Sequence, residues 1–560
     1  MSRKFEIKYK FKTMQPVNFR YLFPNYGGLT LLFIDYIYNF KSVKEFYNHD
    51  FNDFDNLPSL IETVLKNYKN RGEVVQVLKR QNFSYGNHYA SENLELLSRD
   101  NTLAVVTGQQ VGFLSGPLYT IYKIITAIKL SHFLSEKFPD YNFVPVFYLE
   151  SEDHDFFEAN HAKIFNANNE LIKVEFVPAD GFKENYGPVG EIKFDDGIEN
   201  VLQKLKDELQ DSEFKEAVLS LVNSAYQKDI SFVEAFARYV GELFKNFGLI
   251  FLNPNDANLK KLLTPVFEKE IDEHPKLSNR IIDVSAELEK RNYHAQAKPR
   301  AINLFLLYRG GRYPIEPADE EGMFRLKGVR FKFSKGELKH ILETNPQALS
   351  PNVILRPICQ DTLLPTISYI AGPSEIAYFA QLKPAYVYFG VPMPVIFPRI
   401  SATLIEPKVR KVLEKYNINI HEIFSDFPSV AKKITAESLD VDIDGFFHTV
   451  RSRIESLLGE IKDFVSNIEP SLGGAVDNSS SKILYHINSI YEKTINMNQK
   501  RNEIVAKQIE KLKLNLLPED ELQERVLNIT YFLNKYGPSL INRLFDDLEM
   551  FEFNHQILYL

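Results

Sequence analysis

The sequence predicts an α/β protein whose core is a doubly wound parallel sheet and whose C-terminal part is a long hairpin of α-helices. Three observations predict this fold. Two short apolar runs, residues 103–106 and 144–149, have the composition of buried strands, and the amphipathic stretch between them, which opens at Pro117, has helical spacing. Strand, helix and strand in this order imply a right-handed parallel crossover. Near the C-terminus the apolar spacing changes to that of a heptad repeat.

Length, composition and charge limit the class of protein. At about 150 residues per domain, a chain of 560 residues is expected to form three or four structural units. With 44% hydrophobic and 25% charged residues it should fold, and its net charge of -8 gives no general attraction to nucleic acid, so a small polar substrate fits better. No run reaches the roughly 18 apolar residues of a membrane span, and the basic N-terminal stretch lacks the apolar region of a secretory signal. We therefore expect a cytoplasmic protein with no membrane and no nucleic-acid partner.

Two further apolar runs extend the predicted sheet. One is residues 248–253, and the other is the stretch that ends at Arg399. Long segments of mixed character separate them from the first two strands, so the sheet is expected to be discontinuous. Ligands of such sheets bind outside the carboxyl ends of the strands. The polar segments 108–110, 152–155 and 253–256, together with Arg399, fall at those ends, and we expect them to line one cleft.

The segment TGQQVGFLSGPLYTIYK, residues 107–123, is the first candidate for chemistry. Its glycines lie in a loop that runs into a helix, where unpaired backbone N–H groups can receive an anion. It matches neither the Walker loop nor the dinucleotide fingerprint, and the alternative is a glycine-rich turn that lets helix and strand pack closely. Lys123 is a candidate catalytic residue, although a solvated helix lysine is the alternative. The candidate binding residues are Thr107, Gly108, Gln109, Gln110, Gly112, Gly116, Pro117 and Tyr119.

The second candidate is ESEDHDFFEANH, residues 150–161. The carboxylates of Glu152, Asp153, Asp155 and Glu158 surround His154, and His161 shares a helical face with it if the segment is helical. A neutral imidazole held by a carboxylate can act as a general base, so His154, Asp153 and Asp155 are candidate catalytic residues and Glu152 and His161 candidate binding residues. The alternative is a set of helix-capping carboxylates with two surface histidines. The histidines lack the HExxH spacing, so we expect no protein-bound metal.

The third candidate is residues 350–382, which are dense in groups that can orient a substrate. An arginine there offers a planar fork to a carboxylate, and Gly372-Pro373 repeats the loop-to-helix construction of Gly116-Pro117. A structural role is the alternative for most of these residues. The single cysteine, Cys359, excludes an internal disulfide and is interpreted as buried packing. The candidate binding residues are Arg356, Gln360, Asp361, Gly372, Ser374, Glu375, Tyr378 and, after the last strand, Arg399.

Two other patterns have a structural interpretation. KFSK, residues 332–335, can be compared with the lysine-serine-lysine loop of class I aminoacyl-tRNA synthetases, but Ser334 with Glu337 before an apolar helix favours a capping box. Phe447, Val450, Ile454, Leu457, Ile461, Phe464 and Ile468 repeat in steps of three and four, and a weaker seam follows from Ile483 to Gln508. Together these two segments predict an antiparallel coiled-coil hairpin.

Taken in order, residues 107–123, 150–161, 350–382 and the segment MPVIFPR resemble the characteristic segments of the bacillithiol synthase family, over nearly the whole chain. The glycine loop departs from the family pattern at Val111, Phe113 and Ser115. The resemblance implies a Rossmann-like core similar to class I aminoacyl-tRNA synthetases, two connecting insertions and a coiled coil that makes a homodimer. The expected boundaries are 1–165, 241–256 and 346–435 for the core, 166–240 and 257–345 for the insertions, 436–518 for the hairpin and 519–560 for a C-terminal helical segment.

The resemblance also implies a reaction, in which the carboxyl group of cysteine forms an amide with the amine of glucosaminyl malate. A free carboxylate must be activated for this step, so ATP with magnesium is the expected cofactor, through an acyl-adenylate or an acyl-phosphate. On this hypothesis residues 108–117 hold phosphate, and Lys123 or Arg399 stabilises developing negative charge.

On the same hypothesis, His154 with Asp153 or Asp155 prepares the amine, and Arg356 holds the malyl carboxylates. Two alternatives stay open. One is a different ATP-dependent amino-acid ligase on the same core. The other is a ligand-binding scaffold with a synthetase-like core, whose hairpin recruits a protein.

Overall fold

The computed structural model describes residues 16–179, 181, 183–438 and 442–560. It divides into two compact units. The first comprises the chain up to Leu404 together with Pro518–Leu560, and the second comprises Ile405–Leu517. Within the described ranges, no helix is both long enough and apolar enough to cross a membrane.

A five-stranded parallel sheet forms the centre of the first unit. Its order is β12-β11-β1-β2-β5, and every neighbouring pair is parallel. The middle strands are almost fully buried, as expected of a parallel sheet that is covered on both faces. This confirms the predicted α/β fold with a parallel sheet. The strands are β1 (Thr102–Gln110), β2 (Asn142–Glu150), β5 (Ile250–Leu252), β11 (Thr366–Ala371) and β12 (Val395–Pro398).

Two details of this sheet differ from the sequence prediction. β11 lies beside β1 near the middle of the sheet. This strand was not predicted, because its residues belong to the polar segment 350–382 that was assigned to substrate binding. β1 also continues to Gln110, so Thr107 and Gly108 belong to the strand and not to the glycine loop. The loop therefore begins at Val111.

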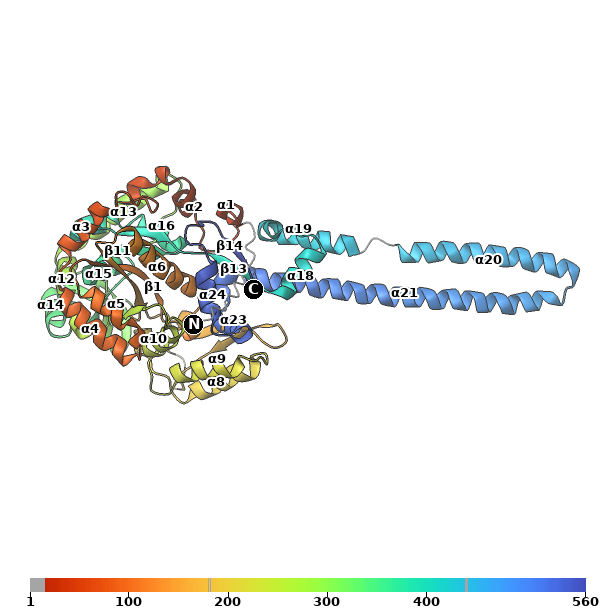
Figure 1. The fold of residues 1–560 in the computed structure, drawn as a ribbon, viewed down its shortest axis with the longest axis horizontal. Coiled ribbons are helices and arrows are strands. Elements are labelled where there is room, and N and C mark those ends of the chain that lie inside the picture. The colour runs from red at the N-terminus through yellow and green to blue at the C-terminus, as the bar shows by residue number, and fades with distance from the viewer. Residues whose placement is uncertain (1–15, 180, 182, 439–441) are drawn as a thin grey trace, which may run out of the picture. The chain divides into compact units, whose positions relative to one another are not determined.

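Helices cover the sheet on both faces (Figure 1). The longest, α6 (Leu118–Lys137), packs against β1, β2 and β11. It follows the predicted loop, and Pro117 is its N-cap residue, one position before the predicted first turn. The other helices around the sheet are α1 (Phe19–Leu22), α2 (Leu31–Tyr38), α3 (Leu57–Asn67), α4 (Arg71–Ser84), α5 (Ser91–Leu97), α15 (Arg356–Leu363), α16 (Pro373–Phe379) and α17 (Lys383–Phe389).

Between β2 and β5 the chain forms a hairpin and a group of helices. The acidic segment after β2 contains only the short helix α7 (Phe156–Ala159), and His161 begins β3. His154 and His161 therefore do not share a helical face, and that prediction is wrong. The elements are β3 (His161–Phe165), β4 (Leu171–Glu175), α8 (Gly197–Glu208), α9 (Lys215–Ala225) and α10 (Phe232–Leu243).

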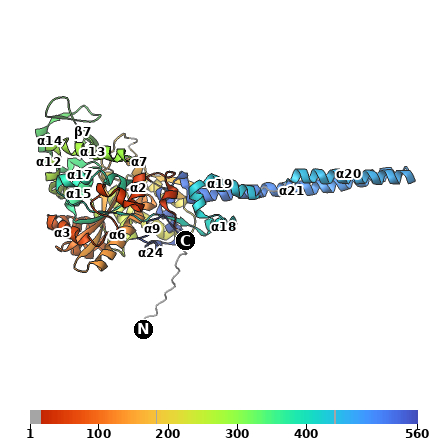
Figure 2. The same ribbon diagram turned by 90° about the horizontal axis from the view of Figure 1, so that it is seen from above.

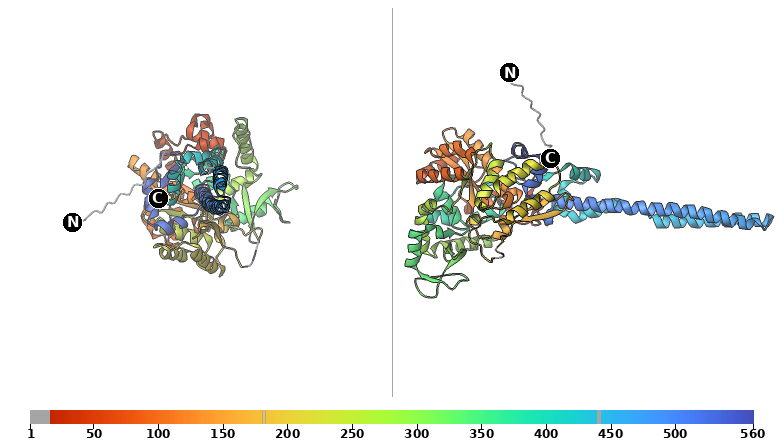
Figure 3. Two further views of the ribbon diagram at one scale, coloured as in Figure 1. Left: turned by 90° about the vertical axis from the view of Figure 1, so that its right-hand side faces the viewer. Right: turned by 90° about the horizontal axis from the view of Figure 1, so that it is seen from below.

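Between β5 and α15 the chain forms the helices α11 to α14 and an antiparallel sheet, whose green strands lie at the edge of this unit in Figure 3. The order of this sheet is β10-β6-β7-β8-β9. Ser334 and Glu337 form the predicted capping box at the start of α14, and Lys335 pairs with Asp272, so KFSK is the end of a strand and a helix cap. The elements are α11 (Ala257–Leu262), α12 (Thr264–Glu273), α13 (Lys276–Lys290), β6 (Leu304–Tyr308), β7 (Gly311–Pro317), β8 (Met323–Leu326), β9 (Lys332–Ser334), α14 (Lys335–Thr344) and β10 (Leu349–Pro351).

The last part of the chain returns to the first unit. Its helices are α22 (Gln523–Val526), α23 (Ile529–Tyr536) and α24 (Leu540–Asp547). It also contains an unpredicted strand, β14 (Gln556–Tyr559), which pairs with β13 (Ala402–Ile405). Leu527 accepts a backbone hydrogen bond from Leu118 at the start of α6, so this returning segment reaches the glycine loop.

The second unit consists of α18 (Pro407–Lys415), α19 (Ile420–Ser438), α20 (Ile443–Ile468) and α21 (Leu472–Leu516). α20 and α21 lie side by side in Figure 1 and Figure 2. The predicted seam is only partly inside this pair. Phe447, Val450 and Ile454 are partly buried, whereas the later seam residues are exposed, as are the apolar residues at every seventh position of α21. The exposed residues are Leu457, Ile461, Phe464 and Ile468 on α20, and Ile483, Ile490, Met497 and Ile504 on α21.

Candidate active site

A cavity of about 680 Å³ lies at the carboxyl ends of the parallel strands. All four polar segments that the sequence places at strand ends contribute to its wall, through Gln109 and Gln110, residues 152–154, Pro254 and Arg399. We refer to it as the main cavity. Of the candidate residues, those that line it are Lys123, Asp153, His154, Gln109, Gln110, Tyr119, Glu152, Arg356, Gly372, Ser374, Glu375, Tyr378 and Arg399.

A smaller cavity of about 290 Å³ shares part of this wall, and we call it the side cavity. Gly112, Gly116, Pro117 and His161 line it, together with residues of the C-terminal segment such as Arg525. The remaining candidates, Thr107, Gly108, Asp155, Gln360 and Asp361, line neither cavity. Asp155 caps α7, where its carboxylate accepts a hydrogen bond from the Glu158 backbone, so it has the structural role that the sequence left open as the alternative.

The glycine loop does not offer a row of free donors. The backbone N–H of Gly112 donates to the Gln110 carbonyl at the end of β1, that of Gly116 to the Phe113 carbonyl, and that of Leu114 to the Tyr226 hydroxyl at 2.8 Å. At the start of α6, Leu118 donates to the Leu527 carbonyl. The expectation that unpaired N–H groups of this loop receive an anion is therefore wrong for these four groups. A glycine-rich turn that allows close packing describes the loop better, because a Cβ on Gly112 would approach Gly116 to 3.1 Å.

Lys123 is buried at the floor of the main cavity. Its ammonium group lies 2.5 Å from the carboxylate of Glu375 and donates to the Gly108 carbonyl at 2.7 Å. Glu375 is held in turn by the Tyr369 hydroxyl and by the Gly372 backbone N–H, each at 2.7 Å. Burial lowers the pKa of Lys123, and the charge of Glu375 opposes this effect. The pair places a fixed positive charge beside the carboxyl end of β1.

Arg356, at the start of α15, directs most of its donors to groups of the protein. Its Nη1 donates to the Gln360 side chain at 3.1 Å, its Nη2 lies within 3.5 Å of the hydroxyls of Tyr369 and Tyr378, and its Nε is 3.6 Å from Glu150. The buried residues Gln360 and Asp361 therefore support Arg356 from behind and do not reach the cavity. Burial raises the pKa of Asp361 to about 6.

His154 belongs to a cluster that includes a residue from the antiparallel sheet. Arg312, in β7, lies with its Nη1 3.1 Å from His154 Nδ1 and 3.5 Å from Asp153. Asp153 also accepts from Gln110 at 2.5 Å, and although burial raises its pKa, the hydrogen bond of His154 and the charge of Arg312 bring it well below the usual range. His154 Nδ1 also lies 3.3 Å from Asp153, so the imidazole either accepts at Nδ1 from Arg312, with its proton on Nε2, or donates from Nδ1 to Asp153.

The ring of Phe305 is a shared platform for this cluster. The guanidinium carbon of Arg312 lies 3.8 Å from the ring centroid and that of Arg300 lies 5.6 Å from it. The His154 ring is 5.8 Å away. Stacked arginines next to an aromatic ring are suited to hold a planar anion such as a carboxylate.

Most of the charged side chains that line the main cavity form ion pairs with other side chains of the protein. Seven basic and five acidic side chains line it. Ion pairs join Lys123 to Glu375, Arg312 to Asp153, Arg356 to Glu150, Arg399 to Glu524, Arg525 to Glu521 and Glu152 to Lys260. Among the described residues, Lys298, Arg300 and Glu158 have no ion-pair partner. Burial and the neighbouring carboxylates Asp155, Asp153 and Glu150 raise the pKa of Glu158.

Several residues of this site were not predicted from the sequence. Phe305 and Arg312 lie in strands of the antiparallel sheet, Lys298 and Arg300 lie in a stretch without regular structure, and Arg525 comes from the C-terminal segment. None of them belongs to a recognisable motif. Glu150 was within reach of sequence reasoning, because it directly follows the predicted strand 144–149, and it is the last residue of the observed β2. Cys359 is buried and burial raises its pKa, which agrees with the interpretation as packing.

The described residues hold no group of three or more histidine, cysteine, aspartate and glutamate side chains that is arranged to bind a metal ion. The carboxylates of the main cavity are instead paired with basic side chains, apart from Glu158. A divalent cation that arrives with a nucleotide needs only one or two carboxylates.

Comparison with known proteins identifies the family. Residues 20–400 match the family model described as bacillithiol biosynthesis BshC, N-terminal Rossmann-like domain, and residues 402–560 match the BshC C-terminal coiled-coil domain. Three similar proteins bear the name "Putative cysteine ligase BshC". The protein of Salinibacter ruber is 36% identical over 95% of this chain and 96% of its own length, that of Chloroherpeton thalassium 37% over 92% and 93%, and that of Chlorobaculum tepidum 36% over 85% and 86%. The two domains and the parallel sheet of the first unit agree with these matches, and the chain therefore belongs to the BshC family of bacillithiol biosynthesis.

Proposed function

We propose that this chain is a cysteine ligase that joins the carboxyl group of cysteine to the amine of glucosaminyl malate. The observation that carries the proposal is the main cavity, which is lined by two basic side chains, Lys298 and Arg300, and by one carboxylate, Glu158, that have no ion-pair partner among the described residues. A substrate that bears both an amine and a dicarboxylate matches these groups. The names of the relatives support cysteine as the other substrate.

Lys298 and Arg300 are the proposed binding residues for the malyl carboxylates. This differs from the expectation that Arg356 holds them, because the donors of Arg356 are directed to Glu150, Gln360 and two tyrosines. Arg300 stacks on Phe305 beside Arg312, so that two guanidinium groups lie on one ring. A dicarboxylate could bind to these basic side chains without breaking the ion pair of Arg312 with Asp153.

Glu158 is the proposed proton acceptor for the attacking amine. It lies on the rim of both cavities and its pKa is raised, so its carboxylate accepts a proton more readily than an ordinary glutamate and can pass it to water. His154 is proposed to donate a hydrogen bond to the reacting carbonyl from Nε2, in the tautomer in which Nδ1 accepts from Arg312. Asp153 holds this imidazole and Arg312 in place.

Lys123 and Arg399 are proposed to stabilise negative charge that develops on the activated carboxyl group. Both line the main cavity, Lys123 beside Glu375 and Arg399 beside Glu524. Charge fixed before the reaction starts stabilises a transition state most effectively when water is excluded, and both side chains are buried.

ATP with magnesium is the proposed source of activation, because a free carboxylate does not form an amide spontaneously in water. The residues fit such a polyanion, since basic side chains outnumber acidic ones on the wall of the main cavity. Lys123, Arg399 and Arg525 would hold its phosphates. A ligase that uses ATP is expected in the cytoplasm.

The second unit is proposed to form an antiparallel coiled coil and a homodimer. The Tyr491 hydroxyl donates to Asp444 at 2.9 Å and the ammonium group of Lys462 donates to Asp477 at 2.8 Å, a pairing order that supports antiparallel helices. The exposed apolar stripes on α20 and α21 would be covered by a second copy. The likeness of the core to class I aminoacyl-tRNA synthetases is part of the same proposal, supported by the parallel sheet with its site at the carboxyl ends of the strands.

Purified protein tests the reaction. The chain is incubated with cysteine, glucosaminyl malate and magnesium ATP, and thiol and nucleotide products are measured by mass spectrometry. Bacillithiol with stoichiometric AMP supports activation as an adenylate, and bacillithiol with ADP supports an acyl-phosphate. A product with another amino acid alone supports a different ligase, whereas binding without turnover supports a ligand-binding scaffold.

A further inference from the structure

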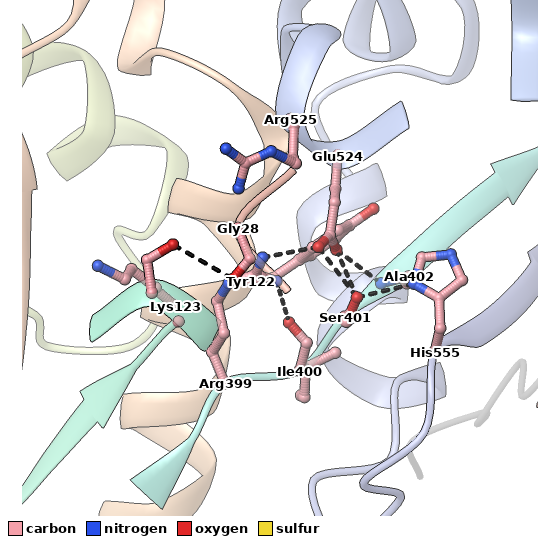
Figure 4. Close-up of polar contacts among 12 residues, drawn as sticks. Gly28, Tyr122, Lys123, Arg399, Ile400, Ser401, Ala402, Glu524, Arg525 and His555 are labelled. Carbon is pink, nitrogen blue, oxygen red and sulfur yellow. Dashed lines mark hydrogen bonds and ion pairs between the residues drawn. The ribbon is translucent and has the colours of Figure 1, made fainter. Parts of the chain in front are cut away.

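Arg399 reaches the main cavity from the loop after β12, and the C-terminal segment holds it from behind. Its Nη2 donates to Glu524 Oε1 at 2.6 Å and its Nη1 donates to the Ile400 carbonyl at 2.8 Å (Figure 4). The side chains of Arg399 and Glu524 are only 4% and 2% exposed. Glu524 lines neither cavity, so any effect on a bound substrate passes through Arg399.

Glu524 is itself fixed by the chain that follows Arg399. The Ala402 backbone N–H donates to its Oε2 at 2.9 Å, and the Ser401 hydroxyl lies 2.9 Å and 3.0 Å from its two oxygens. Burial raises the pKa of Glu524, but the charge and the hydrogen bond of Arg399, together with the hydrogen bond from the Ala402 backbone, lower it below its usual value. The carboxylate is therefore ionised and accepts hydrogen bonds only.

His555, near the C-terminus, completes a directed hydrogen-bond chain. The Ser401 hydroxyl has one proton, which it donates to Glu524, so its oxygen accepts from His555 Nδ1 at 2.7 Å (Figure 4). His555 Nε2 then accepts from the Thr403 hydroxyl at 2.8 Å. This order requires a neutral ring, and burial lowers the pKa of His555 to about 4.

Arg399 and Lys123 both lie near the carboxylate of Glu375. A Cβ on Gly372 would be 3.3 Å from Glu375 Oε2 and 3.4 Å from Arg399 Nε, so Arg399 and Glu375 flank the same glycine. Glu375 is paired with Lys123, and its charge also acts on Arg399. Without the charge of Glu524, Arg399 would be a buried cation with no ion-pair partner, which is strongly unfavourable. It would then compete with Lys123 for Glu375.

We propose that Glu524 is a positioning residue that fixes Arg399 at the cavity wall and thereby reserves Glu375 for Lys123. The C-terminal segment thus completes the active site, although Glu524 lies 125 positions after Arg399 in the chain. The catalytic use of this site rests on the proposed function. The ion pairs of Glu524 with Arg399 and of Glu375 with Lys123 do not depend on it.

Competitive acetylation with acetic anhydride measures the state of Lys123 without turnover. The extent of acetylation of Lys123 is followed against pH by mass spectrometry of its peptide. The charged groups that face Lys123 are Glu375 from α16, Glu150 at the end of β2, and Arg399. If Glu524→Gln turns Glu375 towards Arg399, Lys123 loses the charge that keeps it protonated, and its labelling curve shifts to lower pH by about one unit. An unshifted curve in the folded variant overturns the proposal.

Two further variants distinguish a positioning role of Glu524 from a general loss of structure. Arg399→Gln combined with Glu524→Gln removes the competing cation, so the labelling curve should return to that of the natural protein. Asp546→Asn, which removes an exposed carboxylate of the same segment, should leave the curve unchanged. If Glu524→Gln does not fold, Ser401→Ala loosens Glu524 and should shift the curve in the same direction by less, and no shift in it also overturns the proposal.

Kinetics then test the link to function. Glu524→Gln should lower kcat on the order of 100-fold, by misplacing Arg399, with a smaller change in KM, and Glu524→Asp should restore part of it. A shifted labelling curve in a chain that never ligates cysteine would reject the proposed function and keep the positioning role. Ligation with an unshifted curve and an unchanged kcat in Glu524→Gln would reject the positioning role alone.

Discussion

At the scale of single residues, the position of one proton decides the role of His154. If Nδ1 accepts from Arg312, Nε2 carries the proton and donates a hydrogen bond, whereas if Nδ1 donates to Asp153, Nε2 has the lone pair of the base that the sequence suggested. A glutamine replacement distinguishes the two roles, because the amide nitrogen of glutamine corresponds in reach to Nε2 and can donate a hydrogen bond but cannot act as a base.

The first prediction compares His154→Gln with His154→Ala. If Nε2–H donates to the reacting carbonyl, the glutamine variant should keep activity at least tenfold above the alanine variant, whose kcat should fall on the order of 100-fold. Steady-state kinetics on both, with thermal midpoints as the folding control, give the answer. Equal losses in the two variants would instead support a general base.

The second prediction concerns the pH dependence. Burial and neighbouring carboxylates raise the pKa of Glu158, and the proposed role needs its unprotonated form. Activity should therefore fall on the acid side at a pH above the ordinary range of a glutamate. Glu158→Gln should lower kcat on the order of 100-fold or more and remove this limb from the profile. A Glu158→Gln profile with the same acid limb would contradict the assignment.

At the scale of secondary structure elements, one buried ion pair ties the antiparallel sheet region to the core. Lys260 in α11 is fully buried, pairs with Glu152 after β2 and donates to the Leu349 carbonyl in β10 at 2.8 Å. Glu152 was a predicted binding residue, and it does line the main cavity. The pair shows that it also has a structural partner.

The third prediction is that Lys260→Met destabilises the first unit by about 3 to 5 kcal/mol, since it leaves the carboxylate of Glu152 buried without its partner. Denaturant unfolding measures the loss. Lys261→Met, at the neighbouring exposed position, is the matched control and should change stability little. Similar midpoints for the two variants would show that the pair contributes little.

The elements that the sequence predicted are those with a strong local pattern. β1, β2 and α6 have continuous apolar runs or helical spacing, and the capping box at Ser334 has a specific local signature. β11 was not predicted because its short apolar run lies between polar segments that have the composition of a binding motif. Arg312 and Glu524 could not be found, since each reaches the site through tertiary contacts with residues more than 100 positions away.

At the scale of the whole molecule, the exposed apolar residues of the second unit call for a partner. Two stripes on α20 and α21 stay uncovered in the single chain. A second copy of the chain would cover them in a closed assembly. The predicted domain boundaries within the core stay predictions.

The fourth prediction is that the chain is a dimer, with a mass in light scattering of twice the 64.8 kDa of one chain. Deleting residues 441–516 and joining the ends with a glycine-serine linker should give a folded monomer, because the first unit has its own core. Circular dichroism confirms folding before the mass is interpreted. A concentration-independent monomer of the intact chain would reject the dimer.

The central claim is that this chain performs the last condensation of bacillithiol biosynthesis. Thiol profiling by mass spectrometry in a strain that lacks the gene tests it most directly, with complementation by the natural chain and by Glu158→Gln. We expect that the deletion strain loses bacillithiol and accumulates glucosaminyl malate. The natural chain should restore the thiol, and the Glu158→Gln variant should not. Normal bacillithiol without accumulated precursor in the deletion strain would contradict it.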